Sequence, residues 1–172
     1  LLELLAAILL SLILSQPRWG DQDQVRHFVV VLDNSASMNA VNRDKQTNRE
    51  KALAELTQRV ENSSRNSVVT VILTGYRPEM LVGPAVSWDE AQEALRTWQP
   101  ALPHHEPLSA LDMGVQLAED GGNLIYLTDT MPTAGQHIPR NAEVVAVGTS
   151  LPNVAFTAAR WTVDPETLNG SI

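Results

Sequence analysis

Cysteine is absent from the 172-residue chain, and its absence excludes several kinds of site. A disulfide scaffold, a zinc–thiolate centre, an iron–sulfur cluster and a cysteine nucleophile all need that residue. Positive charge is also scarce, with 12 Lys and Arg against 20 Asp and Glu. Because phosphate binding needs clustered cations, we expect no nucleic-acid partner. The composition therefore directs attention to oxygen ligands.

An apolar run occupies the first 14 residues, LLELLAAILLSLIL, and only Glu3 and Ser11 interrupt it. As a helix this run would span about 20 Å, which is short of the roughly 30 Å hydrocarbon core of a bilayer. A buried core helix would carry a more polar stripe, and a signal peptide would end in small residues rather than at Pro17. We therefore expect a transmembrane helix over residues 1–16, truncated at its start, and a linker over residues 17–26.

Buried strands alternate with amphipathic helices over the next part of the chain. Continuous aliphatic runs, typical of strands covered on both faces, lie at residues 27–33, 67–74, 123–129 and 142–148, with a short edge strand at 80–82. Helices are expected from Thr47 or Asn48 to about residue 62, from Ser87 onward, and over residues 107–118. This order predicts an α/β fold with a doubly wound, mostly parallel, Rossmann-like sheet over residues 27–149.

The pattern changes after residue 149. Residues 153–163, NVAFTAARWTV, alternate in the manner of a half-exposed strand, and a turn is expected between Asp164 and Gly170. We expect residues 150–172 to be the truncated start of a following β-rich domain.

Polar side chains follow two of the predicted strands where each enters a loop. Asp33, Ser35 and Ser37 are spaced two residues apart, so in an extended loop their side chains point the same way. Asp129 ends another strand, and ligands of open α/β sheets gather at the carboxyl ends of the strands. Carboxylates and hydroxyls are hard oxygen ligands of the kind that Mg²⁺ prefers. We therefore expect these four residues to bind Mg²⁺, with Mn²⁺ or Ca²⁺ as alternatives.

The sequence Asp33-x-Ser35-x-Ser37 after one buried strand, with Asp129 after another, resembles the metal-ion-dependent adhesion site of the von Willebrand factor type A domain. The resemblance implies a non-enzymatic interaction module in which an Asp or Glu of a protein partner completes the coordination of the metal. The apolar segment before the domain and the β pattern after it resemble membrane-anchored aerotolerance proteins of the BatA type. This second resemblance implies a membrane protein whose soluble domain faces the periplasm.

One loop departs from the pattern of the family. The family has a Thr at the start of its fourth loop, where this chain reads His104-His105-Glu106-Pro107. We take Glu106 as a further metal ligand, with His105 or Ser109 as alternatives. A glutamate ligand would make the site more anionic and reduce its need for an external carboxylate. Glu106 could equally favour a helix N-terminus, where a carboxylate complements the helix dipole.

Two other functions compete with the interaction module. In a metal-assisted hydrolase or phosphoryl-transfer enzyme, Asp33 would be a nucleophile or ligand, and a second Asp or a cationic phosphate clamp would accompany it. Position 35 is Ser, and no Gly-rich phosphate loop follows it. Alternatively, the domain is a scaffold whose site is degenerate and free of metal. Metal-induced thermal stabilisation distinguishes this last case, because a ligand of the native state must stabilise it.

Overall fold

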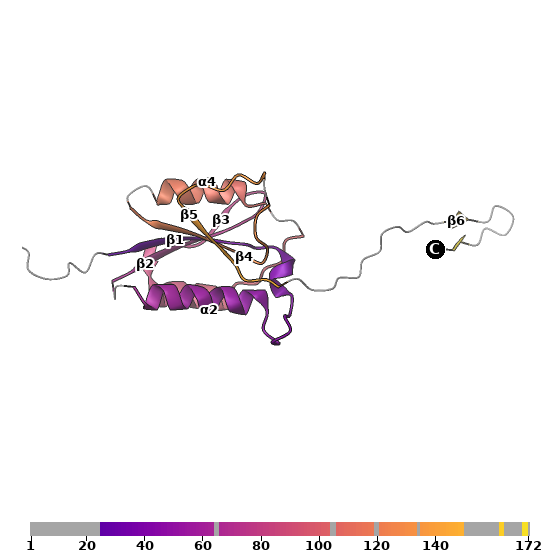
Figure 1. The fold of residues 1–172 in the computed structure, drawn as a ribbon, viewed down its shortest axis with the longest axis horizontal. Coiled ribbons are helices and arrows are strands. Elements are labelled where there is room, and N and C mark those ends of the chain that lie inside the picture. Colours follow the sequence, from indigo (N-terminus) through magenta and orange to yellow (C-terminus); the bar gives the residue numbers. More distant parts are fainter. Residues whose placement is uncertain are drawn as a thin grey trace, which may run out of the picture.

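A five-stranded sheet forms the centre of the computed structural model (Figure 1). The structure describes residues 25–63, 66–103, 106–118, 121–133 and 135–149, together with the backbone of residues 162–163 and 170–171. The strand order is β3-β2-β1-β4-β5, and every neighbouring pair is parallel except the antiparallel pair β2–β3. The strands are β1 (His27–Leu32), β2 (Val68–Leu73), β3 (Glu79–Ser87), β4 (Asn123–Thr128) and β5 (Ala142–Ala146).

Helices cover both faces of the sheet, as Figure 1 shows for α2 and α4. The helices α2 (Asn48–Glu61) and α3 (Trp88–Thr97) pack on one face, and α4 (Leu108–Leu117) packs on the other. β1 lies between the two apolar layers, and its residues from Val29 to Leu32 have no solvent exposure. The buried runs of the sequence therefore correspond to strands covered on both faces, which confirms the predicted mostly parallel α/β sheet.

The predicted starts of α2 and α3 are confirmed by their caps. At α2 the Thr47 Oγ1 accepts from the N–H of Glu50 at 3.1 Å, and the Glu50 carboxylate accepts from the N–H of Thr47 at 2.7 Å. At α3 the Ser87 hydroxyl accepts from the N–H of Glu90 at 3.4 Å. These bonds satisfy backbone donors that have no partner inside the helix, and so they fix where each helix begins.

The edge strand β3 is longer than the sequence pattern indicates. Residues 80–82 were expected, whereas β3 runs over Glu79–Ser87 and includes the pair Gly83-Pro84. Proline lacks the N–H that a central strand needs, so it masks a strand in the sequence, yet an edge strand tolerates it. The pairing with β2 also shifts register between Val69 and Ile72, which lets β3 accommodate this segment.

The predictions for the two ends of the chain lie largely outside the described residues. The expected transmembrane helix over residues 1–16 falls there entirely. In the part of the chain that the structure does describe, none of the helices has the length and apolar character to cross a bilayer. Within residues 150–172, the structure describes the short antiparallel strands β6 (Thr162–Val163) and β7 (Gly170–Ser171).

Candidate metal centre

Asp33 lies directly after β1 and is completely buried. Its Oδ1 accepts a hydrogen bond from the N–H of Ser35 at 2.9 Å, and its Oδ2 accepts from the hydroxyl of Thr128 at 2.7 Å. Its own N–H donates to the carbonyl of Leu127 in the neighbouring strand β4 at 2.9 Å. The carboxylate thus ties the ends of β1 and β4 together and shapes the loop that follows β1.

Ser35 and Ser37 bring their hydroxyls together at the mouth of this loop. The two Oγ atoms are 2.9 Å apart, with Ser35 buried and Ser37 exposed at a short 3₁₀-helix, η1 (Ala36–Asn39). The main chain of this loop is fixed from the other side, because the N–H of Ala36 donates to the carbonyl of Leu102 at 2.8 Å. Of the predicted convergence of Asp33, Ser35 and Ser37, the structure therefore brings the two serine hydroxyls together, whereas the Asp33 carboxylate is bonded to the Ser35 N–H and the Thr128 hydroxyl.

Asp129 faces the same space from the end of β4. A hollow of about 280 Å³ lies at this edge of the sheet, with Asp129 half-buried beside it. The hydroxyl of Thr130 donates to the Asp129 Oδ1 at 3.1 Å, and the N–H of Gly148 donates to the Asp129 carbonyl at 2.9 Å. The hollow is lined by Ser35, Ser37, Asp129, Thr130, Met131, Thr133 and Gln136.

The three residues proposed for the fourth loop lie differently. Glu106 is exposed, and its carbonyl accepts from the N–H of Gly75, which follows β2, at 3.2 Å. Ser109 is exposed on the first turn of α4, and His105 lies outside the described residues. The lining of the hollow includes neither Glu106 nor Ser109. The identity of a further ligand from this loop stays a prediction.

An anchor that the sequence did not indicate holds the loop after β1. The Asn34 Oδ1 accepts from the indole N–H of Trp98 at 3.0 Å, and the Asn34 carbonyl accepts from the N–H of Leu102 at 2.9 Å. Arg49 of α2 in turn donates to the carbonyls of Trp98 at 2.8 Å and Leu95 at 3.0 Å, with its guanidinium over the indole ring. These partners are separated by dozens of residues, so local sequence patterns contain no signal for them.

The charge at the site is negative. Burial raises the pKa of the Tyr126 hydroxyl, which lies on β4, and the carboxylates of Asp33 and Asp129 raise it further. Tyr126 therefore stays neutral and adds no charge of its own to this edge of the sheet. The described residues contain no group of three or more His, Asp and Glu that could hold a metal ion. A cation here would need the serine hydroxyls, and a donor set of carboxylates and hydroxyls fits Mg²⁺ rather than a softer metal.

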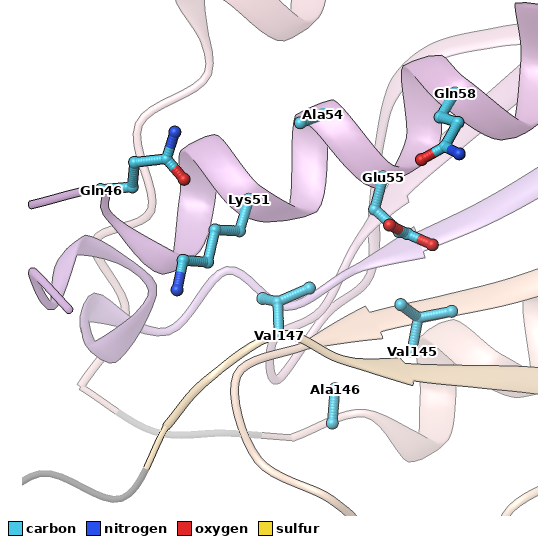
Figure 2. A pocket seen from close by; sticks show the side chains of 8 residues that line it. All are labelled: Gln46, Lys51, Ala54, Glu55, Gln58, Val145, Ala146 and Val147. Atoms are coloured by element: carbon cyan, nitrogen blue, oxygen red, sulfur yellow. The ribbon is translucent and has the colours of Figure 1, made fainter. Parts of the chain in front are cut away.

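A second, larger hollow of about 530 Å³ lies between α2 and β5 (Figure 2). Its charged side chains are paired, since the Lys51 ammonium lies 2.7 Å from the carboxylate of Asp44 and Glu55 forms an ion pair with Arg59. This hollow is therefore a mixed surface without an unpaired charge that would select a ligand. It is lined by Gln46, Lys51, Ala54, Glu55, Gln58, Val145, Ala146 and Val147.

Comparison with known families identifies the domain that contains the candidate metal ligands. The model of the von Willebrand factor type A domain matches residues 28–131, which include Asp33, Ser35, Ser37 and Asp129. The chain belongs to this family. Apart from the first residue of β1, the matched residues contain the strands β1 to β4, the helices on both faces and the strand ends that carry the candidate ligands, and β5 follows them.

Two solved structures share the fold of this type A domain. BatB from Bacteroides thetaiotaomicron has a TM-score of 0.54 and 16% identity, over 82% of this chain and 77% of that one. An aerotolerance-related membrane protein from Bacteroides fragilis NCTC 9343 has a TM-score of 0.51 and 16% identity, over 85% of this chain and 80% of that one. No curated protein matches the chain. The expected resemblance to aerotolerance proteins is therefore confirmed for the fold.

Proposed function

We propose that this type A domain is a Mg²⁺-dependent, non-enzymatic interaction module that binds a carboxylate of a protein partner. One observation carries the proposal: Ser35, Ser37 and Asp129 line a single hollow, and the buried Asp33 is bonded to the N–H of Ser35. These side chains come from the ends of two neighbouring parallel strands, at the edge of the sheet where ligands of α/β folds bind.

Each residue has a distinct part in this proposal. Ser35 and Ser37 offer neutral oxygens, and Asp129 offers a carboxylate at the surface of the hollow. Asp33 adds a buried carboxylate and, through its bond to the Ser35 N–H, holds the serine loop. The metal, when bound, supplies a positive centre that attracts a carboxylate. Because two of the donors are neutral, they leave more of the cation's charge to attract an external anion.

The site lacks the groups that would favour phosphoryl transfer. The hollow is lined by hydroxyls, a carboxylate, an amide and a methionine, and none of its lining residues is a Lys or Arg that could clamp a phosphate. We therefore prefer the interaction module to a metal-assisted hydrolase. Sustained Mg²⁺-dependent turnover of a generic phosphate ester by the purified chain would contradict this choice.

We further propose that the domain is tethered to a membrane and faces the periplasm. The apolar run of residues 1–16 supports the tether, and so does the shared fold with a protein named as an aerotolerance-related membrane protein. In a fractionated cell, the chain should sediment with membranes and resist extraction by high salt. Release of the intact chain by salt alone would contradict the tether.

Thermal unfolding with and without Mg²⁺ tests whether the native domain binds the metal. A ligand of the native state at a concentration about 100 times its Kd stabilises that state by roughly 2.7 kcal/mol. Millimolar Mg²⁺ should therefore raise the Tm of the wild-type chain and leave the Tm of Ser35→Ala unchanged. The matched control Thr97→Ala removes an exposed hydroxyl of α3 outside the hollow and should respond as the wild type does. An equal Tm with and without Mg²⁺ in the wild type would favour the metal-free scaffold.

A further inference from the structure

The segment that follows β5, residues 147–149, contacts two separate parts of the chain around the candidate metal centre. On one side, the N–H of Gly148 donates to the carbonyl of Asp129 at 2.9 Å. On the other side, the hydroxyl of Thr149 donates to the Oδ1 of Asn42 at 2.6 Å. Asn42 belongs to the loop between η1 and α2, so one short segment contacts both the Asp129 end of β4 and the loop beyond the serines.

Two buried amides extend the second contact to Ser37. The Nδ2 of Asn42 donates to the Oδ1 of Asn48 at 2.7 Å, and the Nδ2 of Asn48 donates to the carbonyl of Ser37 at 3.1 Å. Asn42 is only 5% exposed and Asn48 only 4%. Buried amides are costly unless their hydrogen bonds are made, so the order of donors and acceptors in this chain of bonds is restricted.

The Gln46 carbonyl, which accepts from the Nδ2 of Asn42 at 3.2 Å, and the Thr149 hydroxyl together set the direction of the relay. Because the hydroxyl donates to the amide oxygen of Asn42, the amide nitrogen of Asn42 faces the oxygen of Asn48. The nitrogen of Asn48 is then left to face the Ser37 carbonyl. Without the hydroxyl, the Oδ1 of the buried Asn42 loses this donor, and the Asn42 amide is held only through its Nδ2, by the Gln46 carbonyl and by Asn48. A shift of the Asn42 amide then displaces Asn48 and weakens the bond from Asn48 to the Ser37 carbonyl.

Ser37 and Ser35 are held by different parts of the molecule. Ser35 is fixed by the Asp33 carboxylate and by its bridge to Leu102, whereas the main chain of Ser37 is tied to α2 through Asn48. The spacing of the two hydroxyls, 2.9 Å here, depends on both attachments. Mg²⁺ demands near-octahedral geometry, whereas Ca²⁺ accepts a flexible arrangement of ligands. A small displacement of one hydroxyl therefore lowers the affinity of the site for Mg²⁺ more than its affinity for Ca²⁺.

We propose that residues 147–149 brace the metal centre, and that Thr149, Asn42 and Asn48 are positioning residues for the Ser37 hydroxyl. The inference rests on the proposed Mg²⁺ site and adds a regulatory connection to it. A displacement of the chain where it leaves β5 changes the position of Ser37 and hence the affinity for Mg²⁺. By reciprocity, Mg²⁺ binding stabilises the braced position of this segment.

A pair of substitutions at the exposed Thr149 tests the brace without a change in the buried core. Thr149→Val removes the hydroxyl at nearly constant shape, and Thr149→Ser retains the hydroxyl. Loss of a residue that orients a metal ligand commonly weakens metal binding 10- to 100-fold. In the full chain we therefore expect Thr149→Val to weaken Mg²⁺ binding about tenfold and Ca²⁺ binding less. Thr149→Ser should keep the wild-type ratio of the two Kd values. If Thr149 only stabilised the fold, Thr149→Val would lower the fraction of chains that bind metal in calorimetry and leave the ratio of the Mg²⁺ and Ca²⁺ Kd values unchanged.

Hydrogen exchange of the metal-free chain separates the brace from the metal proposal. The N–H groups of Met38 and Ala40 donate to the carbonyls of Ser35 and Ser37 at 3.0 and 2.9 Å, so their exchange reports the order of η1. Faster exchange in Thr149→Val than in Thr149→Ser supports the brace, and equal exchange in the two variants overturns it. If the two variants differ in exchange rate but have the same ratio of Kd for Mg²⁺ to Kd for Ca²⁺, the proposal that Thr149 positions the Ser37 hydroxyl for the metal is overturned. A wild type that binds no metal would refute the proposed function, while the exchange rates would still decide the coupling.

Discussion

Gly148→Ala is expected to displace Asp129, because the backbone of Gly148 leaves no room for a side chain. A Cβ built at this position would lie 2.1 Å from the carbonyl oxygen of Asp129 and 2.9 Å from its carbonyl carbon. The two segments would therefore have to separate by roughly 1 Å to reach a tolerable contact. The separation also weakens the 2.9 Å bond from the Gly148 N–H to the Asp129 carbonyl.

The expected loss of stability combines two contributions. Overpacking of a well-packed site typically costs about 1–3 kcal/mol, and a lost hydrogen bond costs about 1 kcal/mol. We therefore expect Gly148→Ala to lower the free energy of unfolding by about 2–4 kcal/mol, measured by urea denaturation with an unchanged m-value. Mg²⁺ binding should weaken as well, since Asp129 moves relative to the two serines.

Gly121→Ala is the matched control for this substitution. Gly121 has a φ of +87°, and a Cβ there would meet no atom of the described residues within 4 Å apart from those of its chain neighbours. It should therefore cost only the strain of a left-handed backbone, roughly 1–2 kcal/mol, and leave Mg²⁺ affinity unchanged. The reasoning is refuted if Gly148→Ala is as stable as the wild type, or if the two variants bind Mg²⁺ equally well.

Substitutions at three further positions each test one feature of the structure. Thr128→Val removes the donor to the buried Asp33 Oδ2 and should lower the free energy of unfolding in urea by about 1–3 kcal/mol. Thr128→Ser keeps the hydroxyl and should not lower the free energy of unfolding to this extent. An equal loss of stability in both variants would argue against the bond from Thr128 to Asp33. Trp98→Phe removes the N–H donated to Asn34 and should cost about 1 kcal/mol in the same assay, so unchanged stability would argue against that anchor. Burial lowers the pKa of His27 in the folded state, so the unfolded state binds more protons than the folded state just below pH 6.5. The free energy of unfolding of the wild type should therefore fall as the pH is lowered from 7.5 to 5.5. His27→Gln should lose less stability over that range, and parallel pH profiles would contradict this assignment.

The periodic parts of the fold could be predicted from the sequence because their burial is continuous. The strand at residues 27–32 is apolar at nearly every position, and such a run has few alternatives to a strand between two helical layers. The capping box at Thr47 and Glu50 is likewise local, so it marks the start of α2 in the sequence itself. The extent of β3 was missed because the pair Gly83-Pro84 interrupts its pattern.

The candidate site could be predicted only where its residues follow a short spacing or end a strand. Asp33, Ser35 and Ser37 are separated by two residues each, and Asp129 ends a recognisable strand. The supporting contacts are long-range instead: the bond from Trp98 to Asn34 joins residues 64 apart, and the bond from Thr149 to Asn42 joins residues 107 apart. Such pairs depend on how the elements pack, which no local pattern determines.

Calorimetric titration of the full chain with Mg²⁺ tests the metal centre most directly. We predict one Mg²⁺ per chain for the wild type and no measurable binding for Ser35→Ala or Asp129→Asn. The control Asp112→Asn, which removes an exposed carboxylate of α4, should bind as the wild type does. Unchanged Mg²⁺ affinity in both Ser35→Ala and Asp129→Asn would contradict the assignment of the site.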